Sequence, residues 1–97
     1  MCRAVSYSSE AKYEAAIRES LANGKPVIVR VKIPANKYLK YDSNGHYMVA
    51  IGIEGKNLVL ADPYNVKVGG TRYPVIPISC IFQWSKYNGK SAVYLIH

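Results

Sequence analysis

The sequence of 97 residues has little cysteine, few acidic residues and no long apolar run. Its two cysteines, Cys2 and Cys80, allow at most one disulfide bond, which excludes a disulfide-rich scaffold and leaves their pairing open. There is no Cys-x-x-Cys pair and no His/Cys cluster at zinc spacing, so we expect neither a metal nor another cofactor. No segment approaches the ~20 apolar residues that span a bilayer, and the sequence as given begins without the apolar core of a signal peptide.

Acidic residues are outnumbered, with 13 lysines and arginines against 6 aspartates and glutamates and a net charge of +7. Such a surplus can attract nucleic acid, anionic lipid or an anionic polymer through long-range electrostatics. The basic residues are scattered, however, and no RNP-like motif, zinc-finger spacing or basic helix accompanies them. We therefore do not expect nucleic-acid binding, and exposed lysines on an ordinary surface are the simpler interpretation.

Residues 8–23 are predicted to form a helix. Ser8 or Ser9 can supply the N-cap oxygen, and Glu10 lies in the first turn, where the helix dipole favours an acid. Apolar side chains recur at spacings of three and four and form one stripe, made of Tyr13, Ala16, Ile17 and Leu21. Gly24 then ends the helix, because glycine takes the left-handed conformation without a Cβ clash.

Strands are predicted after this helix. Val27–Ile33 is rich in β-branched residues and alternates apolar with basic side chains, as expected for a strand with one solvated face. Residues 34–45 are rich in turn formers and are predicted to be an exposed loop. Tyr47–Ile53 and Leu58–Ala61 flank a short polar turn that contains glycine, so they are predicted to be antiparallel neighbours.

The last third of the sequence gives weaker signals. A loop leads into an extended segment interrupted by Pro74 and Pro77, and residues 79–85 suggest a short helical turn that packs its apolar side chains. Asn88-Gly89 is typical of a turn, and residues 92–97 are predicted to form a final strand.

These elements predict an α+β fold, with one N-terminal helix packed on a mostly antiparallel sheet of about five strands. The length suits one modest core, and no repeat, low-complexity tract or linker interrupts it, so residues 1–97 are predicted to form a single domain. A single helix leaves much of such a sheet uncovered. We therefore expect a further layer, either another chain or a second copy in a homodimer that buries the open apolar face.

The hairpin brings two polar residues together. His46 precedes one strand and Asp62 ends the next, and residue n pairs with roughly residue 111 − n in this register. Asp62, or alternatively Asn65, can therefore reach the imidazole of His46 and fix its tautomer, which gives a base and an orienting group without a nucleophile. On spacing alone, a surface histidine and an Asp-Pro strand terminator are the simpler interpretation.

Several motifs resemble the double-glycine (bacteriocin-processing) cysteine peptidases and their relatives in the papain-like superfamily. In that pattern a helix ends at a Gly-Lys-Pro-Val strand start, a Gly-His opens a later strand, and an Asp-Pro closes the strand after it. The matching residues are Gly24, Lys25, Pro26, Val27, Gly45, His46, Asp62 and Pro63. The resemblance runs from about Cys2 to the C-terminus and implies a papain-like half-domain.

The resemblance implies that His46 is the general base and that Asp62 orients its imidazole. The nucleophilic cysteine of the family, and a glutamine upstream of it, lie in an N-terminal helical half that nothing in this chain matches. Cys2 is a weak candidate for the nucleophile because its segment aligns with a strand, and Cys80 lies among apolar residues where a thiol is usually inert. Gln83 is more simply a structural amide than an oxyanion donor.

Three functional hypotheses remain open. The chain is the His/Asp half of a cysteine peptidase that needs a cysteine-bearing half or partner, or an inactive peptidase-like module that holds a peptide, cell-wall or protein partner, or a minimal hydrolase that uses Cys2. The partners expected are a peptide or protein, with a homo-oligomer possible. Nine tyrosines suit a binding surface, although sheet packing accounts for about half of them. A bacterial or phage protein made in the cytoplasm is expected, and its final address is left open.

Overall fold

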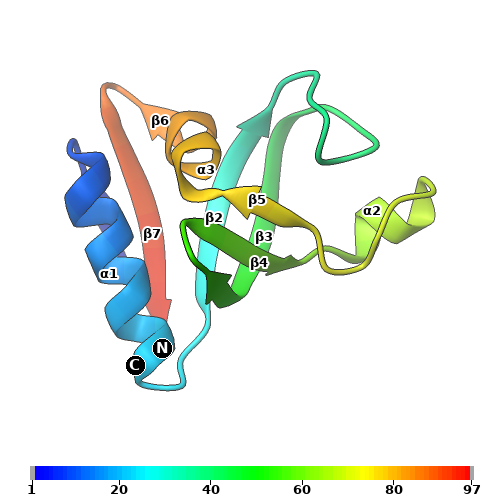
Figure 1. Ribbon diagram of the computed structural model, residues 1–97. Helices are drawn as coiled ribbons and strands as arrows, with labels where there is room; N and C mark the ends of the chain where they lie inside the picture. The colour runs from blue at the N-terminus through cyan, green and yellow to red at the C-terminus, as the bar shows by residue number, and fades with distance from the viewer. Residues whose placement is uncertain (1, 97) are drawn as a thin grey trace.

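The computed structural model describes residues 2–96 as three helices and one seven-stranded antiparallel sheet (Figure 1). In chain order the elements are β1 (Cys2–Tyr7), α1 (Glu10–Ala22), β2 (Val27–Ile33), β3 (Ser43–Glu54), β4 (Asn57–Ala61), α2 (Pro63–Lys67), β5 (Val75–Pro77), α3 (Ile78–Trp84), β6 (Lys86–Tyr87) and β7 (Lys90–Ile96). The sheet order is β1-β7-β2-β3-β4-β5, and β6 pairs with the start of β7. The predicted α+β class is therefore confirmed.

Helix α1 begins and ends close to where the sequence places it. The Ser9 hydroxyl accepts a hydrogen bond from the Lys12 amide at 3.4 Å, which caps the first turn. Gly24 follows the helix with a φ of +73°, the left-handed conformation expected for this cap. Tyr13 and Ile17 are fully buried on the side of the helix that faces the sheet. The Tyr13 hydroxyl also meets the Ser85 hydroxyl at 3.2 Å, so the polar end of this core residue is paired.

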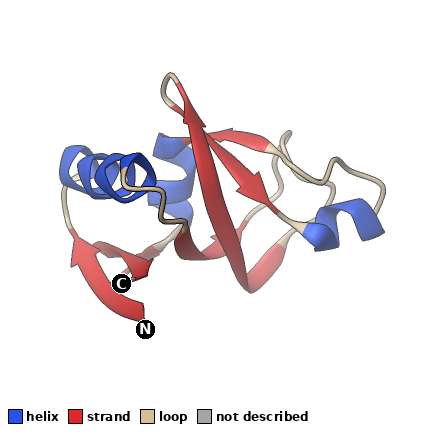
Figure 2. Cartoon of the chain, turned by 90° about the horizontal axis from the view of Figure 1, so that it is seen from below, coloured by secondary structure: helices blue, strands red, loops and turns tan. Residues whose placement is uncertain are grey.

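The helix-covered face of the sheet holds the core. Alternate residues of β2 are buried, and Val93 of β7 and Leu58 and Leu60 of β4 join them. Helices α1 and α3 pack against this face and against each other, whereas α2 stands apart at the end of β4 (Figures 1 and 2). The expected helical turn near residue 80 is therefore confirmed as α3. It acts as a second helix covering the sheet, whereas the prediction counted only one such helix.

Two short elements differ from the sequence-based expectation. Residues 65–67 were expected to be loop, but Pro63–Lys67 form α2, with Pro63 in its first turn, where a missing N–H costs nothing. Residues 86–87 form β6 through the tight turn at Asn88-Gly89, where both residues have positive φ. In addition, the N-terminal segment is a strand, β1, as the family resemblance implied.

The opposite face of the sheet is apolar and largely open. Ile28 pairs with Val49 and with Tyr94, and these half-buried side chains point away from the core. Exposed apolar side chains extend the same surface, with Tyr47 59% exposed and Ile51 47% exposed. We call this surface the outer face. No helix within residues 2–96 is long and apolar enough to cross a bilayer.

Candidate active site

The β3–β4 hairpin places His46 and Asp62 at the same end of the sheet. The hairpin turns at Gly55, which has a φ of +61°, and its register pairs Val49 with Ala61. Asp62 therefore lies one residue beyond the last pair, close to the predicted register. His46 pairs with the buried Val31 of β2, and directly paired residues share a face of the sheet. The imidazole thus lies on the same side as the helix-covered core.

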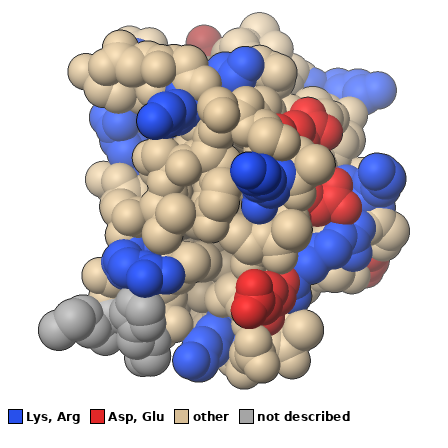
Figure 3. Space-filling view, turned by 90° about the vertical axis from the view of Figure 1, so that its left-hand side faces the viewer, with Lys and Arg blue, Asp and Glu red and all other residues tan. Residues whose placement is uncertain are grey.

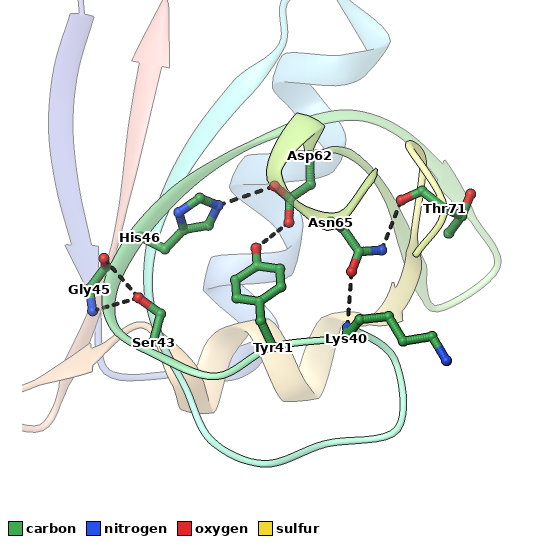
Figure 4. A network of polar contacts seen from close by, with 8 residues as sticks. All are labelled: Lys40, Tyr41, Ser43, Gly45, His46, Asp62, Asn65 and Thr71. Carbon is green, nitrogen blue, oxygen red and sulfur yellow. Dashed lines mark hydrogen bonds and ion pairs between the residues drawn. The ribbon is translucent and has the colours of Figure 1, made fainter. Parts of the chain in front are cut away.

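The imidazole of His46 and the carboxylate of Asp62 are in direct contact (Figure 4). Nε2 of His46 lies 3.2 Å from Oδ1 of Asp62. The Asp62 side chain is 1% exposed, whereas that of His46 is 26% exposed, so the acid is buried behind a base that reaches solvent. Among residues 2–96, no hydrogen bond engages Nδ1 of His46. The pair therefore holds one ring nitrogen and leaves the other available.

Asp62 occupies the N-cap position of α2 but does not cap that helix with its side chain. Aspartate at this position usually accepts a hydrogen bond from the first turn. Here its second oxygen, Oδ2, accepts instead from the Tyr41 hydroxyl. Burial, together with the hydrogen bond to Asp62, raises the pKa of Tyr41 well above its usual value, so the phenol remains a donor. Both carboxylate oxygens are thus used to position side chains.

Two tyrosines flank the histidine. The ring of Tyr41 lies edge-on to His46, with centroids 5.5 Å apart, and edge-on to Tyr64 at 4.8 Å. The centroids of His46 and Tyr64 are 6.2 Å apart. Tyr64 is 46% exposed and comes from α2, while Tyr41 comes from the loop before β3. These contacts limit the orientations open to the imidazole and shield its bond to Asp62 from water.

Asn65, the alternative orienting residue, does not contact the histidine. Its Oδ1 accepts from the Lys40 amide at 2.9 Å, and its Nδ2 donates to the Thr71 carbonyl at 2.8 Å (Figure 4). A Cβ added to Gly70 would lie 2.3 Å from this Nδ2, so only glycine fits there. Asn65, which is fully buried, therefore ties the loop that carries Tyr41 to α2 and to the segment after it.

The structure does not bring Cys2 to this pair. Cys2 pairs with Ile96 on the edge strand β1, which is three strand positions from β3 in the sheet. Adding the offset along the strands, Cys2 and His46 lie about 20 Å apart. The cysteine thiols are both free, with Cys2 exposed.

The other two sequence candidates lie on α3. Cys80 packs against the hydrophobic core, in keeping with an inert thiol. Gln83 is exposed beside Trp84, where both line a hollow with Ser43 and Asn44. No hydrogen bond to the Gln83 side chain occurs among residues 2–96, and no group of three or more His, Cys, Asp or Glu side chains in that range is arranged to hold a metal ion.

Sequence patterns identified His46 and Asp62 but missed the role of Tyr41. The loop that carries Tyr41 gives no periodic signal, and its position depends on Asn65, which lies 25 residues from Lys40. Tyr64 directly follows the Asp62-Pro63 pair, so its position beside the site is easier to infer from the sequence than that of Tyr41.

The arrangement is chemically suited to proton transfer. Nε2–H of the imidazole donates to Asp62, and Nδ1 then carries the lone pair that accepts a proton. A carboxylate on the far nitrogen also stabilises the imidazolium that results. Within residues 2–96, the structure places a base, its orienting acid and a hydroxyl that fixes the acid, but no thiol beside them.

Comparison with known proteins gives concordant results. A crystal structure of a protein from Bacillus anthracis described as a C39-like peptidase matches with a TM-score of 0.55 at 17% identity. The match covers 97% of this chain and 51% of the other, so this chain spans about half the length of that structure and shares its papain-like fold. A search of curated proteins finds no match. The model of the Peptidase_C39 like family matches residues 3–92, and the chain therefore belongs to that family.

Proposed function

We propose that this chain supplies the histidine and aspartate of a Cys-His-Asp peptidase site and acts together with a cysteine-bearing half. The observation that carries the proposal is the buried carboxylate of Asp62, held between Nε2 of His46 and the Tyr41 hydroxyl. A carboxylate so placed fixes the imidazole with Nδ1 unprotonated, which is the form a general base requires. Membership of the peptidase family supports peptide-bond hydrolysis as the reaction class.

In the proposed mechanism, Nδ1 of His46 takes the proton from the thiol of the incoming cysteine. The thiolate then attacks the carbonyl carbon of the peptide, and the imidazolium gives its proton to the leaving amine as the C–N bond breaks. Water, deprotonated by the same nitrogen, then cleaves the thioester and regenerates the thiol. Asp62 stays ionised throughout and stabilises the imidazolium, and donors for the oxyanion come from the cysteine-bearing half.

Residues 1–97 act in this proposal as one domain, and the missing half meets it where the His46 imidazole reaches solvent, on the helix-covered side of the sheet. The outer face lies on the opposite side of the sheet and is a second interaction surface. Ile28, Val49 and Tyr94 form an apolar surface that continues to the exposed Tyr47 and Ile51. Exposed apolar surface of this extent is typical of an interaction site. That the chain spans about half of its structural neighbour supports a cysteine-bearing half of similar size. A second copy of this chain is the occupant proposed for the outer face.

The test is a hydrolysis assay with the cysteine-bearing segment, whether it is joined to this chain or supplied as a separate polypeptide. The substrate is a fluorogenic peptide that ends in Gly-Gly, as the resemblance to double-glycine peptidases suggests. We expect His46→Ala to reduce kcat/KM by at least about a thousandfold and Asp62→Asn by about a hundredfold or more. Cys2→Ser is the control and should leave the activity unchanged.

Hydrolysis that survives His46→Ala contradicts the proposal. Hydrolysis by this chain alone that is lost in Cys2→Ser also contradicts it, and it favours the minimal-hydrolase hypothesis.

The alternative is an inactive peptidase-like module that binds a peptide, cell-wall or protein partner. One observation favours it: Tyr47, Tyr64, Tyr73 and Tyr87 are 46% to 68% exposed, which suits a binding surface on a chain of net charge +7. Hydrolysis that depends on His46 distinguishes the peptidase from this module.

A further inference from the structure

The outer face carries an unbroken apolar row across five strands. Ile28 pairs with Tyr94 on one side and with Val49 on the other. The row extends one strand further at each end, because Tyr94 also pairs with Ala4 and Val49 also pairs with Ala61. Directly paired residues share a face of the sheet, so all five side chains lie on the outer face. We call these five residues the apolar row.

Exposed apolar side chains lie on both sides of the apolar row. Tyr47 is 59% exposed and contacts Tyr94 edge-on, with ring centroids 6.0 Å apart, and Ile51 is 47% exposed beyond Val49. Five strands at about 4.8 Å spacing, over about seven residues of strand length, give a surface of roughly 400–500 Å². Two such surfaces packed together bury roughly 1,000 Å², which is the lower end for a specific interface and fits a reversible dimer.

The charged side chains of the outer face lie at its two ends and differ in sign. Arg30 and Lys32 are exposed between the buried residues of β2, so they lie on the outer face at one end. Glu54 lies at the other end, next to Ile53, whose partner Leu58 is in the core, so Glu54 also lies on the outer face. None of these three charged side chains forms an ion pair among residues 2–96.

The surface around α1 has a different character. Basic and acidic side chains are interspersed there (Figure 3), and Arg18 pairs with Glu14 at 2.8 Å. A mixed charged surface of this kind is well solvated, whereas a contiguous apolar patch with polar residues at its rim is typical of an interface. The outer face is therefore the side of the sheet that we expect a partner to cover.

We propose that two copies of this chain pack outer face against outer face, with their strands running in opposite directions. A two-fold axis across the strands then places the apolar row of one copy on that of the other, with Glu54 of each copy over Arg30 and Lys32 of the second copy. Such sheets lie about 10 Å apart, a gap that these long side chains can bridge. Strands running in the same direction would instead place the cations of the two copies together, which is unfavourable.

The experiment is sedimentation equilibrium of the whole chain, with a reducing agent so that the exposed Cys2 cannot form an intermolecular disulfide. We expect a reversible dimer. Lys32→Glu should weaken it at least about tenfold, even though the change lowers the net charge of each copy. Glu54→Lys should also weaken it, and the double variant Lys32→Glu/Glu54→Lys should restore it. Glu19→Lys, at an exposed position on α1, changes the charge equally and should have no effect.

A chain that stays monomeric at about 1 mM overturns the proposal. A dimer that neither charge reversal weakens, or that the double variant fails to restore, also overturns it. Lys32 and Glu54 are exposed, so the variants should fold, and an unchanged circular dichroism spectrum verifies this. The dimer needs no nucleophile, so the test is independent of the proposed function. Dimerisation without His46-dependent hydrolysis rejects only the peptidase function, whereas His46-dependent hydrolysis with a monomeric chain rejects only the dimer.

Discussion

The open end of the β3–β4 hairpin, where Asp62 lies, and the outer face of the sheet differ in how far their side chains are paired within the chain. At the hairpin end, the polar atoms of Asp62 and Asn65 are buried, and each carboxylate or amide group has partners within the chain. On the outer face, apolar side chains such as Tyr47 and Ile51 are about half exposed, and nearby Arg30 has no ion-pair partner among residues 2–96.

This difference shows which part of the molecule is complete. Buried polar groups are costly unless they are paired, so the hairpin end is preorganised before any other component arrives. An exposed apolar face with unpaired cations at its edge is instead typical of a surface that binds something. The structure thus combines a base and orienting acid that are fully paired within the chain with an exposed surface that is suited to binding a partner.

The largest effect on stability is expected at the open end of the hairpin, from Asn65→Ala. This change leaves the Lys40 amide and the Thr71 carbonyl without their buried partner. We expect a loss of about 2–4 kcal/mol in the free energy of unfolding, measured by urea denaturation. Asn44→Ala, at an exposed position, is the control, with an expected change within about 0.5 kcal/mol. Similar losses in the two variants would show that the Asn65 bonds are unimportant.

A second buried polar pair, under α1, predicts how stability varies with pH. Burial raises the pKa of Tyr13 to about 12, with the Ser85 hydrogen bond acting in the opposite direction. Above pH 10 the unfolded chain loses this proton while the folded chain keeps it, so stability falls as pH rises from 10 to 12. The loss expected from this residue is about 2–3 kcal/mol.

Urea denaturation of the wild type and of Tyr13→Phe between pH 9 and about pH 12 measures this dependence. The difference in unfolding free energy between the two proteins should shrink as pH rises, because only the wild type carries the ionisable group. A constant difference across the range would mean that the pKa of Tyr13 is not raised by folding.

The smallest effect on stability is expected on the outer face. Ile51 is 47% exposed and lies at the irregular point of the β3–β4 pairing, so Ile51→Thr removes little buried apolar area. We expect a change within about 0.5 kcal/mol in the isolated chain. The same variant should weaken self-association of the chain through the outer face, measured by analytical ultracentrifugation. A clear loss of stability together with unchanged self-association would contradict the assignment of the outer face as an interface.

Local sequence signals predicted the scaffold of the site. The cap at Ser9 and the left-handed Gly24 define α1, and the glycine-containing turn at Gly55 brings His46 and Asp62 to one end of the sheet. These features depend on neighbours in the sequence or on one hairpin, and such patterns carry that information.

The remaining parts of the site depend on contacts between distant segments. Tyr41 reaches Asp62 only because Asn65 holds the loop at Lys40, and the fit of Asn65 requires Gly70. No periodicity in the sequence encodes these arrangements.

The central claim is that Asp62 holds Nε2 of His46 and leaves Nδ1 as the base. A long-range ¹H–¹⁵N NMR spectrum of the imidazole nitrogens tests it directly in the isolated chain, with His97→Gln used to assign the signals to His46. The account predicts that neutral His46 is protonated at Nε2, and that Asp62→Asn reduces this preference. Neutral His46 protonated at Nδ1, with the same spectrum in Asp62→Asn, would contradict it.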